Sequence, residues 1–119
     1  ERMQGKNVLV LEDTYSHRLL ATISLDIKQE DNSMAINQFG VHPDLKKNGL
    51  GSYLMYTAFD NAFFHNISVL KLDTAVPAHH LIRFYRRFGF KITGTVKWPI
   101  VNYPSFIMEA SSNYTQTHV

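Results

Sequence analysis

Residues 41–52 decide the fold, and they read Val41-His42-Pro43-Asp44-Leu45-Lys46-Lys47-Asn48-Gly49-Leu50-Gly51-Ser52. This stretch is polar and basic, and it lies between two segments of more regular pattern. Residues 34–41 before it are typical of a strand. Residues 50–65 after it place Leu or Ala at every fourth position, from Leu50 to Ala62. The order predicts a strand, a loop and then a helix with one apolar stripe.

The loop is suited to an anion. Backbone N–H groups in the first turn of a helix lack intrahelical partners and lie at the positive end of the helix dipole. Gly49 and Gly51 have no side chains to keep a phosphate from the backbone, and Lys46 and Lys47 add positive charge. The spacing is neither that of a Walker A loop nor that of a dinucleotide-binding motif. Taken alone, it fits either a phosphate-binding loop or an ordinary strand-to-helix turn with solvated lysines.

Toward the N-terminus, the pattern predicts an antiparallel meander. Val8–Glu12 is a short β-rich run, and in Leu19–Ile27 apolar and polar residues alternate as in a strand with one buried face. With Met34–Val41 these runs make three consecutive strands.

Toward the C-terminus, a parallel crossover and a second helix are expected. Ile67–Thr74 is an apolar run that suits a buried strand. Pro77 is expected to open a helix that ends at Gly89, and residues 90–96 and 105–110 are two further β-like runs. The whole predicts a mixed sheet with two helices, an α/β (α+β) fold in which a β-α-β-α-β-β unit follows the meander.

Composition limits the class of protein. The chain has 119 residues, enough for one domain over residues 1–119, with loose ends expected at 1–6 and 111–119. Its 12 basic and 10 acidic residues leave a charge of +2, too small an excess for a nucleic-acid surface. The absence of cysteine excludes disulfides, thiolate metal sites and a thiol nucleophile. No apolar run approaches the roughly 20 residues of a membrane span, so we expect a cytoplasmic protein without membrane or nucleic-acid partners.

Two motifs in order resemble those of the GCN5-related N-acetyltransferase (GNAT) superfamily. The segment from Val41 to Gly51 resembles its acetyl-CoA pyrophosphate loop, Val-x-Pro-x-x-Arg/Gln-x-x-Gly-x-Gly/Ala. The later segment from Leu81 to Phe90 resembles its Leu-Tyr-x-x-x-Gly-Phe helix end. One helix and one strand separate the two motifs, as in the superfamily, and the resemblance covers residues 8–110. It implies that the two central parallel strands splay apart to admit acetyl-CoA as cosubstrate.

The resemblance also implies roles for individual residues. Phe39 and Val41 would offer backbone groups to pantetheine, and Lys46 would support the charge of the pyrophosphate. The pyrophosphate itself would bind the N–H groups of Lys47, Asn48, Gly49, Leu50, Gly51 and Ser52. Tyr85 matches the position of a general acid, because a phenol can donate a proton or a hydrogen bond to the departing thiolate. A purely structural place for Tyr85 in the core, like that of Phe84 and Phe88, fits the same spacing.

Other positions depart from the superfamily pattern. Ala78 stands where many members carry a cofactor-binding Asn, so that contact is missing or supplied by His79 or His80. The strand before the loop has no carboxylate to act as base, which leaves Glu30, Asp31, His42, Asp73 or a water relay. No metal is expected, because no spaced ligand set accompanies the His79-His80 pair. The aromatic residues Tyr56, Phe59, Phe63 and Phe64 are expected to form core and sheet-packing surface, not a ligand-binding site.

The predicted function is N-acetyl transfer from acetyl-CoA to a primary amine of a small molecule or peptide. A catalytically silent acyl-CoA-binding module of the same fold is the alternative, and a nucleotide-binding interaction domain is a third class. The superfamily's usual first strand and two helices have no counterpart before Val8, so we expect an N-terminally incomplete domain. The acceptor's identity stays open, as does the choice between a monomer and a homodimer.

Overall fold

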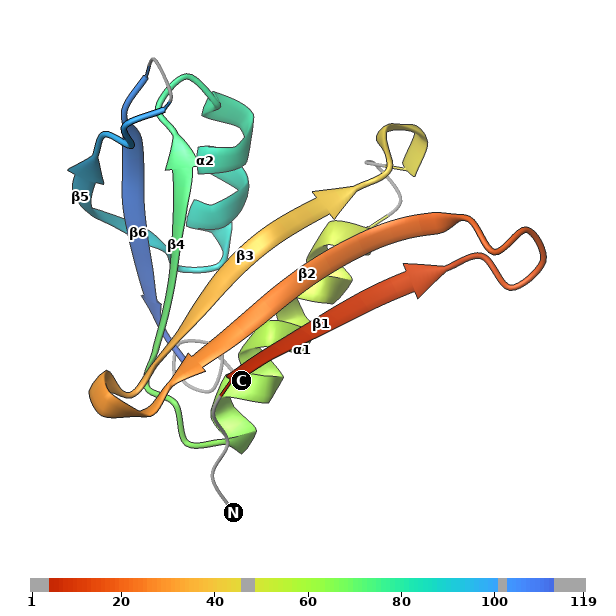
Figure 1. Ribbon diagram of the computed structural model, residues 1–119, viewed down its shortest axis with the longest axis horizontal. Helices are drawn as coiled ribbons and strands as arrows, with labels where there is room; N and C mark the ends of the chain where they lie inside the picture. The colour runs from red at the N-terminus through yellow and green to blue at the C-terminus, as the bar shows by residue number, and fades with distance from the viewer. Residues whose placement is uncertain (1–4, 46–48, 101–102, 113–119) are drawn as a thin grey trace.

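The computed structural model describes residues 5–45, 49–100 and 103–112. Its six strands form one mixed sheet in the order β1-β2-β3-β4-β6-β5, with two α-helices (Figure 1). The strands are β1 (Gly5–Glu12), β2 (Leu19–Lys28), β3 (Ser33–Val41), β4 (Val69–Ala75), β5 (Lys91–Val96) and β6 (Ser105–Ser111). The helices are α1 (Leu50–Phe64) and α2 (His79–Arg87), with short 3-10 turns η1 (Gln29–Asp31) and η2 (Pro43–Leu45). The predicted α/β fold and element order are confirmed.

The first three strands form the expected antiparallel meander. In β2, Ala21, Ile23, Leu25 and Ile27 are buried as the sequence predicted, but Ser24 on the other face is buried as well. β1 begins at Gly5 because the ladder with β2 continues to the pair Gly5↔Ile27. β6 likewise continues to Ser111, paired with Val69. The two segments expected to be loose, residues 1–6 and 111–119, therefore each include residues that belong to a strand.

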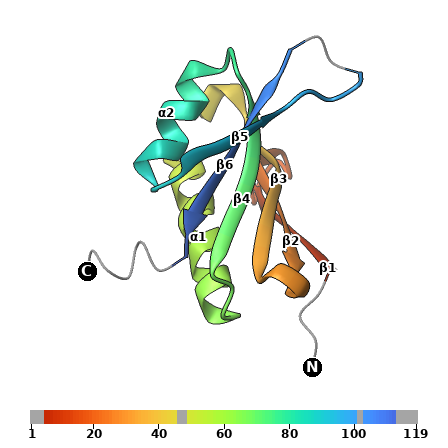
Figure 2. The same ribbon diagram turned by 90° about the vertical axis from the view of Figure 1, so that its left-hand side faces the viewer.

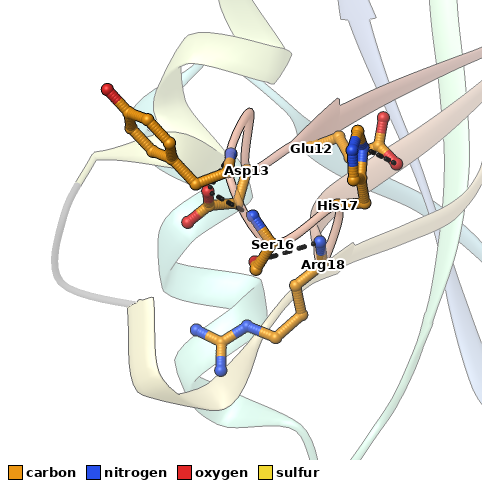
Figure 3. Close-up of polar contacts among 6 residues, drawn as sticks. Glu12, Asp13, Ser16, His17 and Arg18 are labelled. Atoms are coloured by element: carbon orange, nitrogen blue, oxygen red, sulfur yellow. Dashed lines mark hydrogen bonds and ion pairs between the residues drawn. The ribbon is translucent and has the colours of Figure 1, made fainter.

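The β1–β2 hairpin ends in a turn that closes on Asp13 (Figure 3). One carboxylate oxygen of Asp13 accepts hydrogen bonds from the backbone N–H of Tyr15 and Ser16, at 2.8 and 3.2 Å. These two bonds stabilise the charged carboxylate and lower the pKa of Asp13. His17 takes a left-handed φ of 60°, and its ring lies 4.0 Å from the carboxylate of Glu12.

Both helices lie on one side of the sheet (Figure 2), and the core fills the space between. The stripe of α1 is confirmed, since Leu54, Ala58 and Ala62 are buried. The expectation for its aromatic residues was wrong in part. Phe59 is buried, but Tyr56, Phe63 and Phe64 are exposed, because a single helix face can contact the sheet and they lie outside it. No helix in the described ranges is long and apolar enough to cross a membrane.

The second helix ends as predicted but begins later than predicted. A turn with hydrogen bonds from Ala78 N to Ala75 O and from His79 N to Pro77 O precedes it, so the helix starts at His79. At the other end, Gly89 has a left-handed φ of 92° and its N–H bonds Arg86 O at 3.0 Å. The N–H of Phe90 bonds Tyr85 O at 3.3 Å, which completes a Schellman motif.

Candidate functional site

The site begins where β3 and β4 part. These parallel neighbours share three residue pairs, from Ser33↔Val69 to Ala35↔Lys71, and then diverge toward their carboxyl ends (Figure 1). The separation coincides with a β-bulge in β3: Ser24 faces Asn37 and Thr22 faces Gly40, with two residues opposite one between them. The bulge includes Gln38, at a φ of 52°. Because a bulge bends and twists its strand, it turns the end of β3 away from β4.

A cavity of about 330 Å³ fills the opening between the two strands. It is lined from β3 by Ile36, Asn37, Gln38 and Phe39, from β4 by Leu72, Asp73 and Thr74, and from α2 by Leu81 and Tyr85. Backbone groups of β3 beyond Ala35 have no ladder partner on the β4 side. They are free to bind an extended ligand there.

Tyr85 lies at this cavity from the helix side. Its ring is 6 % exposed and packs against Phe39, Phe84 and Phe90, with ring centroids 5.7 to 6.2 Å away. Burial and, to a lesser extent, the nearby negative charge of Asp73 raise the pKa of Tyr85 to about 12. Within the described residues the hydroxyl has no hydrogen-bond partner. The ring is thus a core aromatic, as one of the two sequence interpretations expected, and the catalytic role of the hydroxyl stays a prediction.

A second cavity of about 360 Å³ adjoins the first at the N-terminus of α1, and Phe39 and Leu81 line both. Its other lining residues are Gly40, Val41, Gly51, His80, Phe84 and Arg87. The Arg87 guanidinium lies 5.5 Å from the Phe84 ring centroid, so a positive charge borders a mainly apolar channel.

Two glycines shape the helix start beside this second cavity. Gly49 is the N-cap of α1 at a φ of 79°, a conformation that favours glycine. A Cβ on Gly51 would lie 3.4 Å from Phe39 and 3.5 Å from Phe84, so the first turn of α1 packs beside both rings at a distance that leaves room for no more than a methyl group. No side chain among the described residues caps α1. The N–H groups of its first turn are left without a capping side chain, and Gly51 in that turn lines the second cavity.

The structure brings most of the predicted site residues together. Phe39 lines both cavities, Val41 and Gly51 line the second, and Gly49, Leu50 and Ser52 form the start of α1 beside them. Tyr85 lines the first cavity. Lys46, Lys47 and Asn48 lie outside the described residues.

Of the four expected base candidates, only Asp73 lines the cavity between the strands. Glu30 and Asp31 lie in η1 at the opposite end of β3, and Asp31 pairs with Lys71 at 3.4 Å. His42 follows β3, and its Nδ1 accepts a hydrogen bond from Asp44 N. These three can therefore be set aside.

Sequence reasoning did not single out Arg87 as a lining residue, and it considered His80 only as a metal ligand or a substitute cofactor contact. Their spacing could have shown that both line the same cavity as Phe84, because positions 80, 84 and 87 share one helix face. Ala78 is the N-cap of α2 without a capping side chain. In the described part of the chain, no three His, Asp or Glu side chains gather as metal ligands.

A larger and more open depression of about 950 Å³ lies where β4 begins, lined among others by Arg86, Lys91 and Glu109. It contains none of the predicted site residues.

Solved structures of acetyltransferases share this fold. Nourseothricin acetyltransferase is 18% identical with a TM-score of 0.81, and the match covers 90% of this chain and 65% of that one. Mutant forms of spermidine/spermine N-acetyltransferase from Vibrio cholerae are 21% identical with a TM-score of 0.82, covering 99% and 74%. An IAA acetyltransferase from Bacillus cereus is 17% identical with a TM-score of 0.75, covering 87% and 76%. This chain thus spans less than two thirds of the first of these proteins.

Among curated proteins no sequence matches the chain. The sequence model of the family described as acetyltransferase (GNAT) family matches residues 2–90, which include the loop, the diverging strands and the tyrosine helix. The chain belongs to the GNAT acetyltransferase family.

Proposed function

We propose that this protein transfers an acetyl group from acetyl-CoA to a primary amine. The observation that carries the proposal is the cavity between β3 and β4, with Tyr85 among its lining residues and a glycine-bearing helix start beside it. Pantetheine would pair with the free backbone of β3 near Phe39 and Val41. The pyrophosphate would bind at the start of α1, where Gly49 and Gly51 allow close approach.

In the proposed reaction, the neutral amine nitrogen attacks the thioester carbonyl carbon, and the carbon–sulfur bond then breaks. The nitrogen loses its proton to solvent, and the sulfur leaves as a thiolate that ends as the thiol of CoA. Because Tyr85 has a pKa of about 12, its hydroxyl stays protonated at neutral pH. A thiol has an ordinary pKa near 8.5, so this phenol holds its proton more tightly than the thiolate would. Tyr85 therefore acts mainly by donating a hydrogen bond to the developing thiolate.

A silent acyl-CoA-binding module is the second candidate. It is favoured by the β3 segment that lines the cavity, Ile36–Phe39, which carries no carboxylate. Such a module would bind CoA in the same cavities but release no thiol.

The two candidates differ in a single assay. The protein is incubated with acetyl-CoA and a panel of primary amines, while thiol release is followed and the amines are examined by mass spectrometry. Acetylated amine together with amine-dependent thiol release is the expected result. CoA binding by calorimetry without thiol release for any amine would instead identify the silent module, and the absence of both would refute the cofactor assignment.

A further inference from the structure

Asp73 differs from Asp26 in β2 and Asp31 in η1 in having no cationic partner within the described residues. Asp26 lies 3.5 Å from Lys28, and Asp31 lies 3.4 Å from Lys71. The carboxylate of Asp73 instead accepts one hydrogen bond, from Nε1–H of Trp98 at 3.3 Å. Only one of its oxygens is used in this way, so an exposed negative charge remains beside the cavity.

The place of Asp73 in β4 points it away from the helices. Its neighbours Leu72 and Thr74 are buried on the side of the sheet that α1 and α2 cover, and successive side chains of a strand alternate. Trp98 comes from the loop between β5 and β6, which is fastened to the end of β4 by the hydrogen bond from Val76 N to Pro104 O at 3.1 Å. Leu81 and Tyr85 of α2 thus reach the cavity from one side, and Asp73, which holds the hydrogen bond from Trp98, lines it from the other.

The chemistry of this pair suits a cation. A carboxylate attracts an ammonium group, and an indole face at 46 % exposure can add a cation–π contact. Yet a carboxylate also stabilises the protonated form of the amine that it holds, whereas the attacking nitrogen must be neutral. A cation held at Asp73 is therefore a different nitrogen from the one that attacks.

We infer that Asp73, oriented by Trp98, binds a second and non-reacting ammonium group of the acceptor. The acceptor class is then an amine with two cationic nitrogens, such as a diamine or a longer polyamine. For its catalytic consequence this inference rests on the proposed acetyl transfer, but the binding of a cation by Asp73 can be tested without turnover.

The single tryptophan of the chain provides a direct probe, because its indole N–H gives one unambiguous signal in a ¹⁵N-correlated NMR spectrum. We expect 1,4-diaminobutane, added to the CoA-saturated protein at constant ionic strength, to move this signal saturably. Butane-1,4-diol, a neutral molecule of the same length, should leave it in place. In Asp73→Asn the diamine should no longer move it, whereas in Asp60→Asn, an exposed aspartate on α1, the response should match the wild type. An unresponsive signal in the wild type, or an unchanged response in Asp73→Asn, would overturn the inference.

Kinetics then separate binding from catalysis. Asp73→Asn should raise KM for the diamine about 10-fold, the value of one charge-assisted contact at an exposed site, and leave kcat and KM for acetyl-CoA near wild type. KM for butylamine, which has one nitrogen, should stay unchanged. Trp98→Phe keeps an aromatic ring but removes the hydrogen-bond donor, so it should raise KM for the diamine by a smaller factor.

A fall in kcat for both amines in Asp73→Asn would instead make Asp73 the base and contradict the inference. Should no amine give thiol release, the proposed function fails and the NMR experiment alone decides the role of Asp73.

Discussion

At the scale of single residues, Tyr85 has a structural task in the core, and the proposed function gives it a chemical one. Its ring packs among three phenylalanines, and its backbone carbonyl accepts the hydrogen bond that ends α2. The residue also lines the cavity between β3 and β4. A substitution that removes only the hydroxyl oxygen can therefore separate catalysis from folding.

Tyr85→Phe should keep the fold and the affinity for CoA, because the ring and its contacts remain. It should lower kcat by between roughly 10- and 1,000-fold, as expected when a positioned donor to the leaving group is lost and water replaces it in part. The measurement is steady-state turnover with a saturating amine, and calorimetry with CoA serves as the control. Wild-type turnover in this variant would leave Tyr85 with a purely structural role.

The pKa of Tyr85 also predicts how stability depends on pH. Below pH 10 the phenol is protonated in both the folded and the unfolded state, so it adds no pH dependence. Between pH 10 and about 12 the unfolded chain releases the proton while the folded protein retains it, and the free energy of unfolding falls as pH rises. The loss should be about 2–3 kcal/mol larger in the wild type than in Tyr85→Phe. Urea unfolding of both proteins at a series of alkaline pH values measures this difference. If the free energies of unfolding of wild type and Tyr85→Phe fell in parallel with pH, the Tyr85 hydroxyl would be solvated in the folded protein.

At the scale of elements, local sequence patterns predicted the helices and strands well. The exact strand ends and the side-chain contacts between elements depend on residues distant in sequence. The stripe of α1 and the Gly89 end of α2 follow from spacing and from the need for a left-handed residue. The early start of β1 follows from its ladder with β2, which no local pattern contains. The hydrogen bond from Trp98 to Asp73 depends on the path of the loop between β5 and β6. The contact between the two residues could therefore not be predicted from the sequence.

The two glycines at the start of α1 should respond to alanine in opposite directions. Gly49→Ala should lower the free energy of unfolding by about 1–2 kcal/mol, because an L-residue is strained in the left-handed conformation. Gly51→Ala should raise it by about 0.5 kcal/mol, since alanine favours the helix and its methyl would make ordinary contacts at 3.4 to 3.6 Å. Urea unfolding measures both variants. Equal destabilisation would mean that the approach of α1 to Phe39 and Phe84 leaves no room for a methyl group.

At the scale of the whole molecule, the sheet consists of two halves that three residue pairs hold together. The meander β1-β2-β3 and the group β4-β6-β5 meet through Ser33–Ala35 and then separate around the cavities. A ligand in the opening would contact both halves at once, from Phe39 on β3 to Leu81 on α2. Binding should therefore stabilise the native state as a unit.

Saturating CoA should raise the melting temperature by roughly 5–15 °C, because a ligand at 100 times its Kd adds about 2.7 kcal/mol to the stability of a domain of this size. ATP at the same concentration should raise it much less, since ATP carries phosphates for the start of α1 but has no pantetheine arm for the free backbone of β3. Thermal unfolding measured in parallel with both ligands is the test, and Gly49→Asp is the control. That variant places a negative charge beside the proposed pyrophosphate site and should lose most of the shift. Equal shifts by ATP and CoA in the wild type would make the site a general phosphate-binding loop, and the opening between β3 and β4 would then need another occupant.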